Sequence, residues 1–372
     1  MLFGLLGSPG GCYHRGLCRL TGPLAGLWID ALANLGCSAV VLGVAFVCLP
    51  KRRQLLLSIV RSAAILTICA AIGAYIVYPA RTRCKIYEQV AILSDCQSGA
   101  WLDAAAPLLA SDRMVLFNLG ANTGFTISSY LQRFQHGWRH SNRHWHHALQ
   151  AQQPDVSGGV CDDAEAATSP SAAVPGARVH VVAVELARKN AVLLRHVFGR
   201  LHVHGRVYHA AASDAVGTAH EPGGSGSHDG GFESAAISEA GPVVKMTTAD
   251  ALSAELNVSR IDLLSIDTEG WDSKVIRGAS SLLRRRAVRV LEFEFGTGGA
   301  QGHWGPRTLH DTLQFLQSLG YSCFWEGDRG HLAPATPECN EHAPLKWSNI
   351  VCAHEPAVVE VMRTFTPLRR LD

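Results

Sequence analysis

Polar side chains stand where four apolar runs of the sequence end. A carboxylate or amide at such a point accepts hydrogen bonds from ligand hydroxyl and amino groups, although a single acidic residue is also common as a helix N-cap. Ligands of open α/β sheets bind beyond the carboxyl ends of the strands, so several such residues in strand order predict one binding edge. The four residues are Asn118, Glu185, Asp214 and Asp267.

A glycine turn follows the first of these residues. In GANTG, Gly120 and Gly124 flank Asn122, and apolar residues resume at helical spacing from Ile127. A dinucleotide fingerprint needs G-x-G-x-x-G, and its middle glycine is missing here. The turn is therefore poorly suited to a pyrophosphate, which disfavours a nicotinamide oxidoreductase. It suits a smaller cationic ligand better, namely an adenosyl group that carries a sulfonium and an amino-acid tail.

Strand-like and helix-like runs alternate around these residues, which is typical of an α/β domain with a largely parallel sheet. The predicted helices are Thr123–Phe134, a segment through Leu193–Phe198, Trp271–Leu283, and a segment from Leu309 that Gly320 ends. The predicted strands are Met114–Asn118, Arg178–Val184, Arg206–Ala212, Ile261–Ile266, Val288–Phe295, Tyr321–Trp325 and Ser348–Ala353.

Two polar, low-complexity stretches interrupt this alternation. Residues 136–177 begin with the histidine-rich HGWRHSNRHWHH and continue with an Ala/Ser/Pro/Gly-rich tract, so we predict a mobile loop insertion. The histidines have no cysteine or carboxylate at ligand spacing beside them, so we expect no metal site. Residues 217–231 are predicted to form a second loop.

Five segments occur in an order that resembles the FkbM family of S-adenosylmethionine-dependent methyltransferases. They are FNLGANTGFTISSYL, AVELARKN, AASDAVGTA, TTADAL and IDLLSIDTEGWDSKVIRGASSLL, and the later KWSNIVC also resembles the family. The resemblance covers residues 110–355 apart from the two loops. It implies a Rossmann-like class I methyltransferase fold with a seven-stranded, mainly parallel sheet, and S-adenosyl-L-methionine as the cofactor.

The resemblance also implies roles for residues of the binding edge. Gly120, Asn122 and Gly124 would shape the pocket for the methionine portion of the cofactor. Glu185 would accept hydrogen bonds from the ribose hydroxyls, and Asp214 would lie near the adenine.

The sequence departs from the family at two positions. Asn118 stands where an acidic residue usually opens the first motif, and Ser265 stands where a lysine is common. An amide still accepts a hydrogen bond, so Asn118 remains a predicted cofactor-binding residue.

Methyl transfer from a sulfonium makes two demands on the protein. It must align the acceptor oxygen with the methyl group, and a base must accept the proton of the acceptor. The predicted catalytic residues are Asp267, near the methyl group, and Glu269, as the base or as support for the turn. Glu292 and Glu294 alternate with apolar residues on the fifth strand, and one of them is in a position to reach the same edge.

The N-terminal part of the chain has the composition of a membrane anchor. Of the 372 residues 47% are hydrophobic and 17% are charged, and Ser62–Tyr78 contains no charged side chain. About 20 apolar residues span a bilayer core, and Leu24–Leu49 is long enough. A cleaved signal peptide would need a shorter apolar region near the start. We therefore predict a tail over residues 1–23, an anchor of one or two transmembrane helices over 24–79, a stem over 80–109, a methyltransferase domain over 110–355 and a C-terminal tail over 356–372.

Charge and cysteines favour a lumenal domain. Basic residues between the two apolar segments slightly outnumber those after the second, which favours a cytosolic loop between the segments. The chain after residue 80 would then lie in the lumen. Asn257 opens a glycosylation sequon. A cytosolic domain with reduced cysteines remains the alternative, and the net charge of +2 gives no case for nucleic acid. An oxidising compartment permits the even set of cysteines beyond the anchor, Cys84, Cys96, Cys161, Cys323, Cys339 and Cys352.

These features together predict a membrane-anchored methyltransferase of the Golgi or ER that acts on a hydroxyl of a sugar, a glycan or another natural product. The acceptor class follows from the family alone. The alternative is a membrane-anchored, non-catalytic binding or scaffold protein with a degenerate methyltransferase fold. Asn118 and Ser265 favour this alternative. The intact GANTG and IDTEG segments oppose it, together with Glu185 and Asp214.

Overall fold

The computed structural model describes residues 99–156, 175–221, 237, 241–296, 304, 306–327, 330–342 and 347–366. The predicted membrane anchor over residues 24–79 and most of the predicted stem lie outside these residues. Among the described residues, no helix combines the length and the apolar character needed to cross a bilayer.

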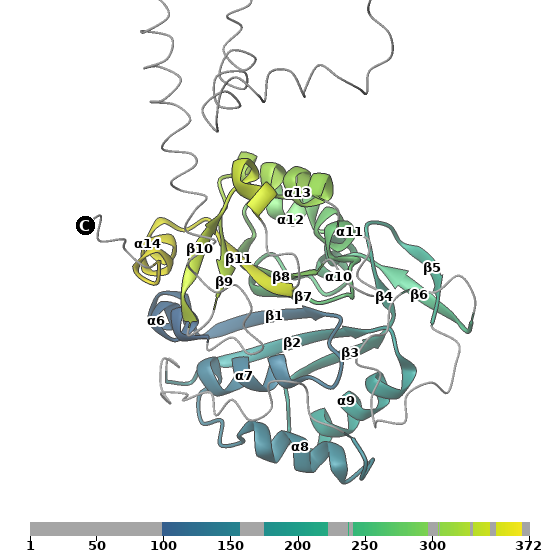
Figure 1. Cartoon of the computed structure of the whole chain (residues 1–372). Coiled ribbons are helices and arrows are strands. Elements are labelled where there is room, and N and C mark those ends of the chain that lie inside the picture. Colours follow the sequence, from purple (N-terminus) through teal and green to yellow (C-terminus); the bar gives the residue numbers. More distant parts are fainter. Residues whose placement is uncertain are drawn as a thin grey trace, which may run out of the picture. The chain divides into compact units, whose positions relative to one another are not determined.

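An eight-stranded sheet forms the centre of the domain (Figure 1). Its strand order is β10-β9-β11-β8-β7-β1-β2-β3. Strands β3, β2, β1, β7 and β8 are parallel to one another. Strand β11 runs antiparallel to β8, β9 runs antiparallel to β11, and β10 runs antiparallel to β9. The strands are β1 (Arg113–Leu119), β2 (Arg178–Glu185), β3 (Gly205–His209), β7 (Ile261–Ile266), β8 (Val288–Gly296), β9 (Ser322–Glu326), β10 (Leu332–Ala335) and β11 (Trp347–Ala353).

The seven-stranded prediction was one strand short. The eighth strand, β10, has the sequence LAPA and pairs only with β9, at the edge of the sheet. Proline is tolerated in an edge strand because its missing N–H faces outward, but Pro334 and the short length remove the pattern by which a strand is recognised in a sequence.

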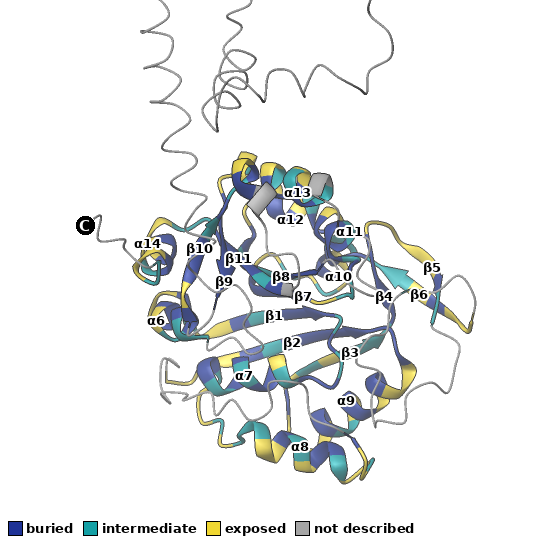
Figure 2. Cartoon of the chain, in the orientation of Figure 1, coloured by how far each residue is buried: buried dark blue, intermediate teal, exposed yellow. Residues whose placement is uncertain are grey.

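Helices cover both faces of the sheet (Figure 1), and burial follows this arrangement (Figure 2). All six residues of β7 are buried, as expected for a parallel strand that is covered on both faces. One face carries α7 (Phe125–Phe134), α8 (Asn142–Gln150) and α9 (Arg188–Arg200). The other carries α10 (Ala249–Glu255), α11 (Asp272–Arg277), α12 (Ser280–Arg284) and α13 (Pro306–Ser318).

Two further helices pack together beside the antiparallel strands. They are α6 (Ala100–Leu109) and α14 (Pro356–Thr364), and a short 3-10 helix (Pro337–His342) precedes β11. Arg289 at the start of β8 joins them, because its Nη1 donates to the carbonyl of Leu109 at 2.6 Å and its Nη2 donates to Glu355 at 2.8 Å. The folded domain therefore includes helices on either side of residues 110–355.

Tertiary packing divides two elements that the sequence predicts to be continuous. The strand predicted over Arg206–Ala212 is divided into β3 and β4 (Ala211–Ala212), and β4 joins a separate three-stranded sheet. The helix predicted over Trp271–Leu283 is divided near Gly278, where a Cβ would overlap the carbonyl oxygen of Ser213. The close approach of the two backbones is a contact between distant segments, so local periodicity does not reveal it.

Residues 217–231 and 136–177, both predicted to be loops, contain regular structure. Gly217–His220 is strand β5, which pairs with β6 (Val243–Thr247). Helix α8 lies within residues 136–177 and buries Trp145, whose indole N–H donates to the carbonyl of Thr123 at 2.9 Å. The exposed face of α8 is rich in polar residues and histidine. The composition of the segment therefore does not reveal its narrow apolar stripe. Residues 157–174 and 222–231 of these stretches lie outside the described part of the chain.

We expect Trp145→Ala to destabilise the domain by about 3–5 kcal/mol, the usual loss for truncating a fully buried aromatic side chain. Trp145 is 0% exposed and its ring meets that of Phe198 edge to face. His147→Ala is the matched control, because His147 is exposed on the same helix and its removal should change stability by less than about 0.5 kcal/mol. Chemical denaturation of the two variants measures the difference. Equal stabilities would show that α8 does not dock as described.

Candidate active site

The turn after β1 lies directly against the end of β7. Gly120 has φ +85°, and a Cβ at this position would overlap the carbonyl oxygen of Asp267. The backbone N–H groups of Gly120 and Ala121 both donate to the carbonyl of Val184, at 2.9 and 3.0 Å. Glycine is therefore required at position 120 both by the backbone conformation and by the approach of two chain segments.

Gly124 has a different reason for being glycine. It precedes α7 with φ +89°, and a Cβ there would lie 2.5 Å from Leu194 and 2.7 Å from Trp145. The space beside Gly124 is thus filled by α8 and α9, and Gly124 is not among the residues that line the pocket described below. Its predicted role with the cofactor remains a prediction.

Glu185, at the end of β2, holds the glycine turn in place. It is 4% exposed, its Oε2 accepts the backbone N–H of Asn122 at 2.7 Å, and its Oε1 accepts that of Ala187 at 2.8 Å. Burial raises the pKa of Glu185 to about 7, although these two hydrogen bonds oppose the shift. The carboxyl therefore changes its charge near neutral pH.

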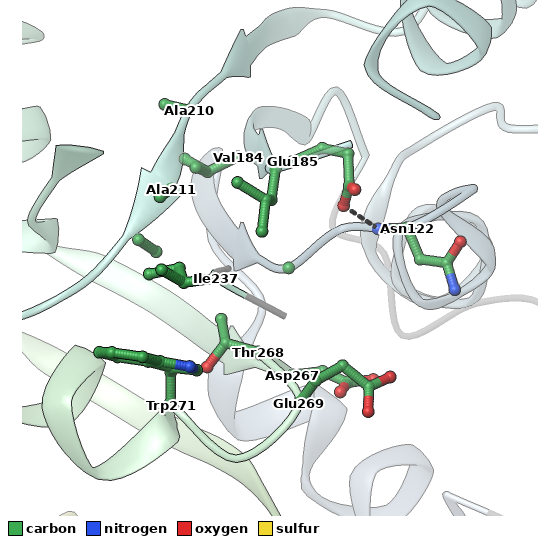
Figure 3. A pocket seen from close by; sticks show the side chains of 13 residues that line it. Asn122, Val184, Glu185, Ala210, Ala211, Ile237, Asp267, Thr268, Glu269 and Trp271 are labelled. Carbon is green, nitrogen blue, oxygen red and sulfur yellow. Dashed lines mark hydrogen bonds between the residues drawn. The ribbon is translucent and has the colours of Figure 1, made fainter. Parts of the chain in front are cut away.

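The strand ends enclose a pocket with an empty volume of about 490 Å³, which includes space open to solvent. Figure 3 shows an acidic side, with Glu185, Asp267 and Glu269, and an apolar side, with Ala210, Ala211 and Ile237. Gly120, Asn122, Val184, Leu186, Ala212, Thr268 and Trp271 complete the lining, and no described lining residue carries a positive charge.

The two predicted catalytic residues line this pocket together. Asp267 follows β7 and is exposed toward the pocket, yet protein atoms surround it closely enough that desolvation raises its pKa. Glu269 has φ +54°, an unusual conformation for a residue other than glycine. A pocket of this kind attracts a cationic ligand and can accept a proton at Asp267 or Glu269.

Besides Gly124, two further predicted cofactor residues lie outside the lining. Asn118 is 2% exposed at the end of β1, and its Oδ1 has no hydrogen-bond partner among the described residues. Asp214 is exposed and accepts a hydrogen bond from the Ser213 hydroxyl at 3.1 Å. The structure therefore brings Gly120, Asn122, Glu185, Asp267 and Glu269 together in the pocket, and it leaves Asn118, Gly124 and Asp214 outside it.

Sequence reasoning missed the apolar wall of the pocket. Ala210, Ala211 and Ile237 come from the chain after β3 and from the segment between β5 and β6. Alanine carries little chemical signal, so only the fold identifies these residues. Trp271 directly follows the IDTEG segment, and its position next to that motif was the one available clue.

Residues 118–323, more than half of the chain, match the family described as the methyltransferase FkbM domain. The chain belongs to the FkbM methyltransferase domain family. The prediction of an S-adenosylmethionine-dependent methyltransferase domain is thereby confirmed. No curated protein matches the chain.

Similar solved structures include methyltransferase FkbM from Methylobacillus flagellatus KT, with 12% identity, a TM-score of 0.35, and coverage of 65% of this chain and 44% of that one. Precorrin-6y C5,15-methyltransferase from Geobacter metallireducens GS-15 has 9% identity, a TM-score of 0.27, and coverage of 68% and 86%. A SAM-dependent methyltransferase from Agrobacterium tumefaciens has 11% identity, a TM-score of 0.29, and coverage of 69% and 60%. The chain spans less than half the length of the Methylobacillus protein.

The residues of this FkbM domain fit the cofactor of the family. S-adenosylmethionine carries a sulfonium and an amino group, which suit a lining with three carboxyl groups and no cation among its described residues. The apolar wall suits a flat adenine ring, and the unpartnered Oδ1 of Asn118 is a buried acceptor two residues before the glycine turn. An anionic dinucleotide would meet like charges here, which disfavours the oxidoreductase further.

We expect Gly120→Ala to destabilise the FkbM domain by more than about 2 kcal/mol, since a strained backbone adds to an overlap with the Asp267 carbonyl. S-adenosylmethionine affinity should fall at least about tenfold with it. Gly137→Ala is the control, because Gly137 also has positive φ (+70°) but a Cβ there would meet no atom within 4 Å. Thermal unfolding and calorimetric titration measure both effects, and equal losses in the two variants would contradict the close approach.

Proposed function

We propose that the protein is a membrane-anchored O-methyltransferase that transfers the methyl group of S-adenosylmethionine to a hydroxyl of a sugar, a glycan or another natural product. The observation that supports this proposal is the pocket itself. Gly120, Glu185 and Asp267 come from three neighbouring strand ends and line one cavity. A cationic methyl donor and a neutral hydroxyl acceptor are both compatible with its acidic side.

The cofactor supplies a methyl group on a sulfonium, which is already an activated leaving group. The protein therefore has to bind, orient and remove a proton. Gly120 and Asn122 provide a bare backbone turn for close contact, and Glu185 keeps that turn in place. Asp267 and Glu269 border the same pocket, so either carboxylate is available to accept the proton of the acceptor hydroxyl.

The charge of the pocket supports a neutral or cationic acceptor. An acceptor with a carboxylate or phosphate close to its reactive hydroxyl would face the acidic side chains Glu185, Asp267 and Glu269. Like charges at short distance in a partly desolvated site disfavour binding. A sugar hydroxyl carries no such penalty.

The scaffold alternative rests on Asn118 and Ser265, and neither residue lines the pocket. Ser265 is buried on β7 and lies between Asn118 of β1 and Glu292 of β8 in the register of the sheet. The two departures thus leave the lining of the pocket unchanged, which supports a working enzyme over a scaffold.

We further propose that the FkbM domain faces the lumen of the Golgi or ER, with residues 24–79 as the anchor. A disulfide between Cys323 and Cys352 supports an oxidising compartment. These residues are directly opposite each other on β9 and β11. Asn257, the first residue of the Asn257-Val258-Ser259 sequon, is exposed just after α10 and thus accessible to a glycosyltransferase.

The proposed activity is tested by calorimetric titration of the full-length protein, in detergent, with S-adenosylmethionine and with NAD. We expect binding of S-adenosylmethionine only. Addition of a cell extract and fresh cofactor should then increase the mass of a neutral, hydroxyl-bearing compound by one methylene group. Asp267→Asn should reduce this product at least about tenfold, the usual contribution of a positioned base being larger. Absence of S-adenosylmethionine binding would reject the enzyme.

The proposed location is tested by endoglycosidase treatment of the full chain expressed in cells with a secretory pathway. We expect the treatment to increase its electrophoretic mobility and to release no soluble domain from the membrane fraction. Ser259→Ala, which removes the sequon at an exposed position, should abolish the shift. A membrane-bound protein without the shift, and with free thiols at Cys323 and Cys352, would place the domain in the cytosol.

A further inference from the structure

The register of the sheet brings the carboxyl groups of Asp267 and Glu294 together beside the pocket. Ser265 of β7 pairs with Glu292 of β8 in parallel strands. Side chains two residues apart lie on the same face of a strand, so Asp267 and Glu294 come side by side, one step nearer the pocket. The same periodicity pairs Glu292 with Ser265, one step farther from the pocket.

Glu294 lies next to Asp267 but does not itself line the pocket. It is 6% exposed and is not among the lining residues, whereas Asp267 lines the pocket. The two carboxyl groups are hydrogen-bonded to each other. Such a bond requires a proton between them, so at least one of the two groups is neutral.

The surroundings show which of the two is neutral. Burial, followed by the negative charges of Asp267, Asp272 and Glu269, raises the pKa of Glu294 to about 11. The pKa of Asp267 is also raised by burial, but the hydrogen bond from Glu294 opposes this shift. Near neutral pH, Glu294 is therefore the donor and Asp267 is the acceptor.

A buried scaffold fixes the position of Glu294. Its backbone N–H donates to the Oδ1 of Asp272 at 3.2 Å, and the other oxygen of Asp272 accepts from the Thr268 hydroxyl at 3.1 Å. Asp272 is 0% exposed, and burial raises its pKa to about 8. Asp272 thus links the segment after β7 to strand β8 next to Asp267.

We infer that Glu294 is a positioning residue, which donates a hydrogen bond to Asp267 and holds its carboxylate toward a cationic ligand in the pocket. This inference rests on the proposed function, because it takes the ligand to be the S-adenosylmethionine cofactor. The oriented charge favours the cationic methyl donor over S-adenosylhomocysteine, the neutral product of the same shape, and so it favours exchange of product for fresh donor.

Glu292 offers a matched comparison on the same strand and face. Its two oxygens accept hydrogen bonds from the Tyr130 hydroxyl and from the Asn349 amide, the latter at 2.9 Å. It is half-buried and is bonded to α7 and β11, away from the lining of the pocket. Loss of Glu292 should therefore change stability without changing the selectivity of the pocket.

The experiment measures, by calorimetry on the full-length protein at pH 8, the dissociation constants of S-adenosylmethionine and S-adenosylhomocysteine. Glu294→Gln keeps a donor toward Asp267, and Glu294→Met has nearly the same shape without one. We expect the preference for the charged ligand to fall about five- to tenfold in Glu294→Met and in Asp267→Asn. It should stay within about twofold of the wild type in Glu294→Gln and in Glu292→Gln, whose melting temperatures are recorded alongside.

The pH dependence provides a second readout, which a purely structural residue would not change. The charged form of Asp267 is lost as pH falls through its raised pKa, so the preference should decline toward acid pH in the wild type. Without the donor, the pKa of Asp267 rises further, and the decline should move to higher pH in Glu294→Met but not in Glu294→Gln. Asp272, Glu185, Glu269 and Glu292 are the other carboxyls near the pair, and they are the same in all three proteins.

The outcomes separate the two proposals. A wild-type protein that binds neither ligand overturns the proposed function and this inference with it. Binding of both ligands with an unchanged preference in Glu294→Met overturns the positioning role alone. A Glu294→Gln variant that behaves like Asp267→Asn also overturns it, because an ionised rather than a donating carboxyl would then be needed.

Discussion

The close approach of the turn after β1 to the end of β7 is the constraint on which the site depends. The backbone of Gly120 lies against the Asp267 carbonyl, where a Cβ would overlap it, and Glu185 binds the N–H of Asn122 from the third strand end. Three neighbouring parallel strands therefore end in one cluster of backbone and carboxyl groups. The pocket exists because these ends converge, and its acidic residues lie at the ends of strands or in the segments directly after them.

Burial of carboxyl groups is the second constraint. On the face that carries α6 and α7, side chains change from apolar to polar toward the pocket: Leu116 is followed by Asn118, Leu263 by Ser265, and Val290 by Glu292. Desolvation raises the pKa of the carboxyls here, to about 8 for Glu326. A raised pKa of an acid in the folded state gives stability that is complete below the unfolded pKa and is lost as pH rises through the folded one. The stability that these groups contribute therefore falls as pH rises from the ordinary carboxyl range toward their raised pKa values.

Different features of the sequence indicate the FkbM domain and the anchor proposed before it. Strand order, motif order and the family match all describe the same site, so local sequence and global fold agree there. The anchor proposed for residues 24–79 rests on composition alone, since about twenty apolar residues are enough to span a bilayer whatever their order. Which acceptor binds depends on the shape and charge of the pocket, and its acidic side chains favour a neutral or cationic compound.

The strands Ile261–Ile266 and Val288–Gly296 could be predicted almost to the residue from the sequence alone. The glycine turn and the carboxylates at strand ends could also be predicted, because apolar runs, glycine and acidic residues are local signals. Tertiary structure decided what those residues contact. It placed Asp214 outside the pocket lining, assigned Gly124 to packing against Trp145, divided the helix at Gly278, and turned a histidine-rich stretch into α8. It also placed Glu294, and not Glu292, directly beside Asp267. Each of these is a contact between segments far apart in the chain, and periodicity in one segment carries no information about the partner that will lie beside it.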